Sequence, residues 1–300
     1  MGALDPATAA EQPVGLGRAM DIQSVIVGAG AILTDTMRAV MNVMKNRLGR
    51  ISGFPWAAMA AHFFQRDHRW TQSAVLSTSG QHLERKAMGQ LNAGIVPVTP
   101  FQQNCTILFD MDDKQGVVVD PGGDVDKILA VLKDNAITAK AIWVTHGHID
   151  HAGGAMDLKD ALSIDIIGPH EADRPLLANL ENQAKRFGLT DPVRNCIPDR
   201  FLSEGDTVSF GEHSFEVLHC PGHAPGHVVY YNRAAKFAHV GDVLFRGSIG
   251  RTDLPGGDHA ALITSIKDKL LPLGDDIGFI CGHGPGGRFG EERRTNPFLA

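Results

Sequence analysis

Four potential metal ligands stand within six positions of the chain, in the segment Thr-His-Gly-His-Ile-Asp-His at residues 145–151. The apolar run 141–144 directly before this segment predicts a buried strand. Because a strand delivers its last residues to one edge of a sheet, the glycine-bearing loop that follows can fold back there. His146 and His148 are then expected on one side of the loop, and Asp150 and His151 on the other. A His-x-His pair alone is usually a surface turn, but chance rarely sets four ligand types in this register.

Three further candidate ligands lie far downstream, and each comes just after an apolar, strand-like run of its own. These residues are His223, Asp242 and His283, after the runs 215–218, 237–240 and 277–280. Seven ligand-type residues at four predicted strand ends indicate two metal ions side by side. Neutral imidazoles together with carboxylates suit zinc, and they also suit non-haem iron or manganese.

From about residue 95 the pattern is rich in strands and then alternates strands with helices. The predicted strands are 95–98, 106–109, 116–119, 141–145, 165–167, 207–210, 215–219, 228–231, 237–240 and 277–281. The predicted helices are 126–135, 153–162, 171–187 and 258–270, and the segment 171–187 is expected to cap the cleft. Two strand-rich halves with helices outside predict an α/β fold of two sheets face to face, each covered by helices.

The motif segment, followed by the three downstream ligands in this order, resembles the metallo-β-lactamase superfamily. From about residue 88 to residue 300, the chain more closely resembles glyoxalase II-like thioesterases, the hydroxyacylglutathione hydrolases. The best match is the short bacterial type, which lacks a C-terminal helical domain. The matching segments are 95–105, 119–124, 218–227, 241–245, 250–253 and 270–276. The resemblance implies that residues 89–300 form one hydrolase domain, a four-layer αββα sandwich of the metallo-β-lactamase type.

The resemblance also implies how the ligands divide between two metal ions. The ligands of the first ion would be His146, His148 and His223. Those of the second would be Asp150, His151 and His283, with Asp242 bridging both ions. A bridging carboxylate keeps two cations roughly 3.5–4 Å apart, close enough to share one hydroxide. The expected cofactors are therefore two divalent ions, with zinc favoured and iron or manganese as alternatives, and the expected catalytic carboxylates are Asp150 and Asp242.

The reaction implied by the resemblance is hydrolysis of a thioester such as S-lactoylglutathione, as in methylglyoxal detoxification. A metal-bridging hydroxide would attack the carbonyl carbon while one metal polarises the carbonyl oxygen. A thiolate can leave without an acid catalyst, because its conjugate thiol is already fairly acidic. The expected partner is thus a small-molecule thioester, which suits a site with no obvious proton donor.

Weaker predictions concern residues around the ligands. Asp120 stands at a predicted strand end and is a candidate to hydrogen-bond a metal-bound imidazole, against a simple turn-stabilising role. Without a helical domain, other groups must bind the two glutathione carboxylates, and three arginines in loops near predicted ligands are candidates: Arg251, Arg246 and Arg288. For any one of them, an ordinary surface arginine is the simpler interpretation. His227 is expected to support or pack against a ligand rather than to be one.

Three alternatives to a thioester hydrolase stay open. A persulfide dioxygenase, a mononuclear iron enzyme of the same superfamily, shares the resemblance at residues 250–253. A lactamase is less favoured, because a common ligand set in that branch puts Cys near the position of Asp242. A non-catalytic binding or electron-transfer domain is disfavoured by the complete set of seven ligands.

The charge and the cysteines of the chain limit which partners and which cellular location are expected. The net charge is −6, but residues 89–300 carry 19 Lys and Arg against 28 Asp and Glu. An acidic domain would repel a phosphate polyanion, which argues against nucleic acid as a partner. The four cysteines show no Cys-x-x-Cys spacing and are expected to be reduced and mostly buried. The expected location is the cytoplasm.

Residues 1–88 do not resemble the rest of the superfamily. They are predicted to be a poorly structured extension, or sequence upstream of a true start at Met88. Their apolar run 25–33 lacks the third glycine of a dinucleotide fingerprint, since Leu33 stands there, and Asp35 and Arg38 keep it too short for a membrane span. It is also a poor signal peptide, so no membrane partner is expected. A basic amphipathic helix at 36–50 leaves a membrane-surface or targeting role as an alternative.

Overall fold

The computed structural model describes residues 20–21, 89–189 and 191–300. The predicted extension of residues 1–88 lies outside the described residues, apart from Met20 and Asp21, so what was expected of it stays a prediction. Those two residues form a short strand that pairs with Ala93 and Asn92 at the edge of the first sheet.

The first sheet contains seven strands in the order β1-β2-β3-β4-β5-β6-β7. Neighbours from β1 to β4 are antiparallel, and those from β4 to β7 are parallel. The strands are β1 (Met20–Asp21), β2 (Leu91–Val98), β3 (Gln103–Asp110), β4 (Gln115–Val119), β5 (Thr138–Trp143), β6 (Asp165–His170) and β7 (Arg200–Leu202). Every strand predicted between residues 95 and 167 is present, whereas the three-residue β7 was not predicted.

The second sheet contains six strands in the order β15-β14-β11-β10-β9-β8, and only β11 and β14 pair in parallel. The strands are β8 (Thr207–Phe210), β9 (His213–His219), β10 (Val228–Asn232), β11 (Phe237–His239), β14 (Gly278–Ile280) and β15 (Gly287–Arg288). A separate two-stranded sheet joins β12 (Leu244–Phe245) to β13 (Ser248–Ile249). The strands β12, β13 and β15 were not predicted.

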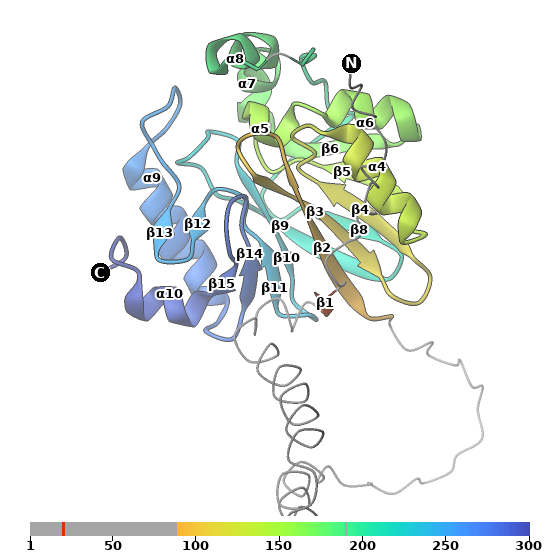
Figure 1. Ribbon diagram of the computed structural model, residues 1–300. Helices are drawn as coiled ribbons and strands as arrows, with labels where there is room; N and C mark the ends of the chain where they lie inside the picture. The colour runs from red at the N-terminus through yellow and green to blue at the C-terminus, as the bar shows by residue number, and fades with distance from the viewer. Residues whose placement is uncertain (1–19, 22–88, 190) are drawn as a thin grey trace, which may run out of the picture. The chain divides into compact units, whose positions relative to one another are not determined.

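Helices cover the outer face of each sheet, as Figure 1 shows. The helical segments are α4 (Val125–Asp134), α5 (Ile149–Ala152), α6 (Ala155–Leu162), η1 (Glu171–Asp173), α7 (Arg174–Leu177), α8 (Leu180–Phe187), α9 (His259–Thr264), η2 (Ser265–Leu270), η3 (Leu271–Leu273) and α10 (Phe289–Thr295). Apolar residues of α4, α6 and α8 pack on the first sheet, and those of α9, η2 and α10 pack on the second. The described residues therefore form the predicted four-layer αββα sandwich.

Alternate residues of the central strands serve two different cores. In β3, Ile107 and Phe109 point to the helix-covered side and Leu108 points between the sheets. In β5, Ile142 and Trp143 divide in the same way. Because side chains alternate across a strand, a strand covered on both faces must be apolar throughout. This is why the motif strand appears in the sequence as a continuous apolar run.

Aromatic side chains fill the space between the two sheets. The ring of Trp143 lies 5.2 Å from that of Phe215 and 5.0 Å from that of Tyr230, and all three are fully buried. The hydroxyl of Tyr230 in the second sheet donates to the carbonyl oxygen of Val144, just past the end of β5, at 2.9 Å. The two sheets are thus bonded to each other directly beside the motif loop.

Two predicted helices differ from their expected form. The segment 171–187 is not one helix, because a new helix, α7, begins at Arg174 with Pro175 in its first turn, and a second break precedes α8. Proline lacks a backbone N–H and restricts the residue before it, so it favours the first turn of a helix over its interior. The segment 258–270 begins as predicted, with the Asp258 carboxylate accepting from the N–H of Ala261, but it continues as the π-helical η2.

All four cysteines are free and buried, as their spacing predicted. Within the described ranges, no helix combines the length and the apolar character that crossing a membrane requires.

Candidate metal centre

The seven predicted ligands lie together where loops from both sheets meet. His146, His148, Asp150 and His151 follow β5 of the first sheet, whereas His223, Asp242 and His283 follow β9, β11 and β14 of the second. They form three overlapping groups whose ligand atoms lie within 4.8 Å of one another. The groups are His146, His148 and His223; His146, His151 and Asp242; and Asp150, His151 and His283.

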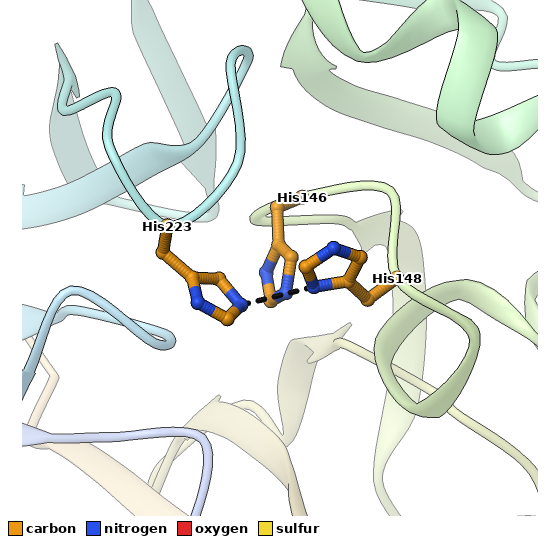
Figure 2. A group of neighbouring side chains, drawn as sticks. All are labelled: His146, His148 and His223. Carbon is orange, nitrogen blue, oxygen red and sulfur yellow. Dashed lines mark hydrogen bonds between the residues drawn. The ribbon is translucent and has the colours of Figure 1, made fainter. Parts of the chain in front are cut away.

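Figure 2 shows the first group, in which three imidazole rings converge from two separate loops. Nδ1 of His148 lies 2.9 Å from Nε2 of His223, and all three rings are buried. Each pair of rings is nearly perpendicular, with centroids 4.7–4.8 Å apart. This edge-on arrangement turns ring nitrogens, rather than ring faces, toward a common centre.

Asp242 lies between the first group and the remaining ligands. Its Oδ2 is 3.6 Å from Nε2 of His223 and 3.7 Å from Nε2 of His283, and its Oδ1 is 3.4 Å from Nε2 of His151. Asp150 completes the far side, with Oδ2 3.1 Å from Nε2 of His283. One carboxylate therefore faces histidines of every group.

A hydrogen-bond chain sets which nitrogens of His146 and His151 carry protons. Asp120 accepts three bonds, from the backbone N–H of Thr145 at 2.7 Å, from its hydroxyl at 2.7 Å, and from Nδ1 of His151 at 2.9 Å. Because the Thr145 hydroxyl donates to Asp120, it must accept from Nδ1 of His146, 3.0 Å away. Nδ1 of both imidazoles therefore carries a proton, which leaves Nε2 as the atom of each ring that would bind a metal.

Two further contacts orient the ligands from the second sheet. Nδ1 of His223 donates to the carbonyl oxygen of Arg251 at 2.8 Å, which directs its Nε2 to the cluster. Nε2 of His227 accepts from the backbone N–H of Asp242 at 3.0 Å, and its ring stacks on that of His146 at 4.6 Å. His227 therefore supports both halves of the site without belonging to any of the three ligand groups.

Burial keeps the first group of imidazoles neutral. It lowers the pKa of His146 well below its ordinary value, that of His148 to about 3, and that of His223 below its ordinary value. The neighbouring histidines add to this effect on the pKa of His146 and His148. Neutral imidazoles keep the lone pairs that bind transition metals.

The ligands His151, Asp150 and Asp242 have the opposite electrostatic character. Burial lowers the pKa of His151, but the carboxylates of Asp242, Asp150 and Asp120 outweigh it and hold the pKa well above its ordinary value. Burial likewise opposes ionisation of Asp150 and Asp242, yet the adjacent histidines keep the pKa of both carboxyl groups below their ordinary value. Negative charge concentrated in a buried cluster favours a cation there.

Unpartnered atoms test whether these residues fit a metal. Nε2 of His146, Nε2 of His151 and Oδ1 of Asp242 are buried and make no hydrogen bond among the described residues, although the last two face each other at 3.4 Å. Such atoms are costly unless something satisfies them, and all three are ligand atoms for a divalent cation. A Cβ at Gly282 would overlap Oδ1 of Asp242, so only glycine leaves this space open. The residues present therefore fit bound metal.

Asn104 in β3 holds the loop that carries His283, a role that sequence reasoning missed. Its backbone N–H donates to the carbonyl oxygen of Gly282 at 2.7 Å, and its side chain donates to Cys281 and Gly284 at 2.9 and 2.8 Å. No local sequence pattern predicts this contact, because the partners lie about 180 positions apart in the sequence.

A cavity of about 600 Å³ opens over the ligand cluster. Its floor includes His148, Asp150, His223, Asp242 and His283. Its apolar walls come from Phe101, Ile149, Leu176, Phe187, Phe245 and Leu254. This volume lies in the range of pockets for small molecules, and the predicted cap contributes to the walls through α7 and α8.

Of the three predicted arginines, one lines the cavity and two do not. Arg251 lines the cavity, but its guanidinium makes two 2.7 Å bonds to the carboxylate of Asp253. Arg246 and Arg288 are not among the lining residues, and Arg288 donates instead to the carbonyl oxygen of Asp276 at 3.3 Å. Their proximity to ligands in sequence did not bring them to the site. Arg186 of α8, which was not predicted, lines the cavity.

Known proteins resemble this chain over the same region. Residues 98–283 match the profile of the Metallo-beta-lactamase superfamily. Hydroxyacylglutathione hydrolase GloC of Haemophilus influenzae is 46% identical over 210 residues, which cover 70% of this chain and 98% of that protein.

Two crystal structures show the same fold at 40% sequence identity. BLEG-1 B3 metallo-beta-lactamase superposes with a TM-score of 0.64 and covers 69% of this chain and 99% of its own. TTHA1623 in a di-iron-bound form superposes with a TM-score of 0.63 and covers 68% of this chain and 99% of its own.

Proposed function

Because this chain belongs to the metallo-beta-lactamase superfamily of metal-dependent hydrolases, we propose that it hydrolyses thioesters of the hydroxyacylglutathione class, such as S-lactoylglutathione. The fold of this family implies that the chain binds divalent metal. Support for this substrate comes from the Haemophilus influenzae relative, which is named a hydroxyacylglutathione hydrolase and is 46% identical to this chain over 210 residues. The matching region spans 98% of that relative.

The position of Asp242 carries the proposal of a dinuclear centre. Its carboxylate lies 3.4–3.7 Å from histidine nitrogens on both sides, which suits a ligand shared by two cations. His146, His148 and His223 would hold one ion, and Asp150, His151 and His283 the other. When bound, such a pair lowers the pKa of a shared water and polarises a substrate carbonyl.

The chain's own groups prepare the site for this chemistry. Asp120 and Thr145 fix the tautomers of two ligands before any substrate arrives. The apolar walls displace water from an acyl group held over the ligands. A thiolate leaving group needs no proton donor, so the site is adequate for a thioester without a further acid.

A lactam is a second candidate substrate, and one observation favours it. BLEG-1, at 40% identity, is described as a B3 metallo-beta-lactamase. An amine leaving group, unlike a thiolate, must be protonated as it departs. The thioester is therefore the better match to a site built from imidazole ligands and carboxylates.

Zinc is the proposed native metal, because His and Asp ligands without Cys suit it. Iron is the alternative, since a relative at 40% identity was crystallised with two irons. We also propose a cytoplasmic location, which four free and buried cysteines support. Cell fractionation with an antibody to the chain tests the location.

The decisive experiment is metal quantification on the full chain purified without added metal, paired with three assays. The substrates are S-lactoylglutathione, a chromogenic cephalosporin, and glutathione persulfide with an oxygen electrode. We expect about two metal ions per chain, set by the two ligand groups, and thioester hydrolysis that a chelator abolishes. One iron per chain with oxygen uptake, or lactam turnover exceeding thioester turnover, would overturn the proposal.

A further inference from the structure

Helix α8 turns one regular face toward the cavity. Asn179, Asn182, Gln183, Arg186 and Phe187 all line it, at spacings of three and four residues that place them on one side of a helix. The adjoining face carries Leu180 and Ala184, which are buried in the core beneath. Figure 1 shows α8 beside α7 at the end of the molecule where α5 lies.

Gln183 fastens this face to the metal-ligand loop. Its side-chain amide donates to the carbonyl oxygens of Gly147 and Leu176 at 3.1 and 3.0 Å, and its Oε1 accepts from the N–H of Ile149 at 3.0 Å. Gly147 and Ile149 flank the ligand His148 directly in sequence. The helix therefore has a defined position relative to the reacting centre.

Arg186 is the cation that this face offers to a ligand. The second arginine in the cavity wall, Arg251, is already neutralised by Asp253. Among the described residues, no carboxylate pairs with Arg186, and its side chain is exposed. Beside it on the same face, the amides of Asn182 and Asn179 share a 2.7 Å hydrogen bond.

We propose that Arg186, with the neighbouring amides, binds a carboxylate on the thiol part of the substrate. The proposal rests on thioester hydrolysis as the proposed function. A lactoyl group carries no charge, so the anionic group must belong to the thiol, as it does in glutathione. A guanidinium matches a carboxylate with two parallel hydrogen bonds, and residues 89–300 otherwise carry an excess of acidic groups that would repel such a substrate.

The test compares Arg186→Gln and Arg186→Lys with the control Arg194→Gln. Arg194 pairs with Asp157 and Asp160 and does not line the cavity. Each variant is assayed with S-lactoylglutathione and with the same thioester whose two carboxylates are esterified. Binding of S-methylglutathione, an unreactive thioether with both carboxylates, is measured by titration calorimetry on the metal-loaded full chain.

We expect Arg186→Gln to raise KM for S-lactoylglutathione and Kd for S-methylglutathione about tenfold, as loss of a charged hydrogen bond predicts. On the esterified thioester, Arg186→Gln should leave KM nearly unchanged. Arg186→Lys should give KM and Kd values between those of the wild type and Arg186→Gln, and Arg194→Gln should match the wild type. Equal losses on both thioesters, or no loss on either, would refute the role of Arg186. Wild-type protein that hydrolyses neither thioester would instead refute the proposed function itself.

Discussion

Oδ2 of Asp120 lies 2.9 Å from Nδ1 of His151, and both side chains are fully buried. This contact leaves Nε2 of His151 as the atom that faces Asp242. Because Asp120 also holds Thr145, which orients His146, a single carboxylate orients one ligand on each side of the proposed pair of ions.

Asp120→Asn should weaken metal binding about 10- to 100-fold while the chain still folds, because an amide reproduces the shape but not the charge that orients His151. Competition with a chromophoric chelator measures the affinity. The control is Asp124→Asn, an exposed residue whose carboxylate accepts from the backbone N–H of Thr99 and contacts no ligand. Equal affinities for the two variants would contradict the role of Asp120.

Asp242→Ala should reduce hydrolysis about 100-fold or more and lower the metal content, since no other carboxylate among the described residues faces both sets of histidines. Metal analysis after gel filtration and kcat on S-lactoylglutathione measure the two effects. Asp276→Ala, which removes an exposed carboxylate paired with Lys236, is the matched control. If Asp242→Ala retains both its metal and its turnover, the carboxylate is not a bridge.

Gly282→Ala should cost metal and activity, because the new Cβ would overlap Oδ1 of Asp242 and lie 2.6 Å from Cε1 of His151. The control is Gly284→Ala, two residues on, where a Cβ meets no atom within 4 Å. Its φ of +70° is unfavourable for alanine and should cost about 1 kcal/mol of stability, yet leave the metal content unchanged. Identical metal contents in the two variants would contradict the close approach at Gly282.

Gln183→Ala should reduce kcat/KM about tenfold and speed hydrogen exchange at Ile149, because two hydrogen bonds from α8 to the ligand loop and one to Leu176 of α7 are lost. Gln183→Glu keeps the acceptor for the Ile149 N–H and should show an intermediate effect. Lys185→Ala, on the exposed side of the same helix, is the control. Unchanged exchange at Ile149 in Gln183→Ala would show that α8 is held by other contacts.

Asp110→Asn should change how stability depends on pH. Burial raises the pKa of Asp110, but hydrogen bonds from the Asp112 backbone, the His213 ring and the Asp113 backbone outweigh it, so the pKa lies below the ordinary value of 3.8. A carboxyl group with a lowered folded pKa stabilises the fold above its unfolded pKa, and that stabilisation is lost as the pH falls through the folded pKa.

The wild type should therefore lose more free energy of unfolding between about pH 5 and pH 3 than Asp110→Asn does. At pH 7 the variant should be about 1–3 kcal/mol less stable, because a charged acceptor for buried His213 is gone. Urea unfolding across this range measures both effects, with the exposed neighbour Asp112→Asn as control. Parallel pH profiles for wild type and Asp110→Asn would contradict the assignment.

The ligands could be predicted because each follows a short apolar run, and the end of a strand is a local property of sequence. The αββα layers could be predicted because buried strands and amphipathic helices are also local patterns. Arg186 could not, because its place at the cavity depends on where α8 docks, and the break before α8 hid the helix face that it shares with Asn179 and Gln183. The i, i+3, i+4, i+7 spacing of these polar residues was the available signal.

Short elements were missed for a different reason. β7 has three residues and β15 only two, so neither carries enough alternation to be recognised before its neighbour in the sheet is known. The contact of Asn104 with the His283 loop is likewise visible only once β3 and β14 lie near each other.

The hydrogen bond from Tyr230 to Val144, which joins the two sheets, has a consequence for the metal preference of this protein. The ligands of the candidate centre come from both sheets, so the spacing between the sheets sets the distances between ligands of the first sheet and ligands of the second. A larger or smaller side chain at Trp143, Phe215 or Tyr230 would change that spacing without touching the site. Variation in these distant aromatic positions is therefore a route by which related chains could shift metal preference while keeping all seven ligands.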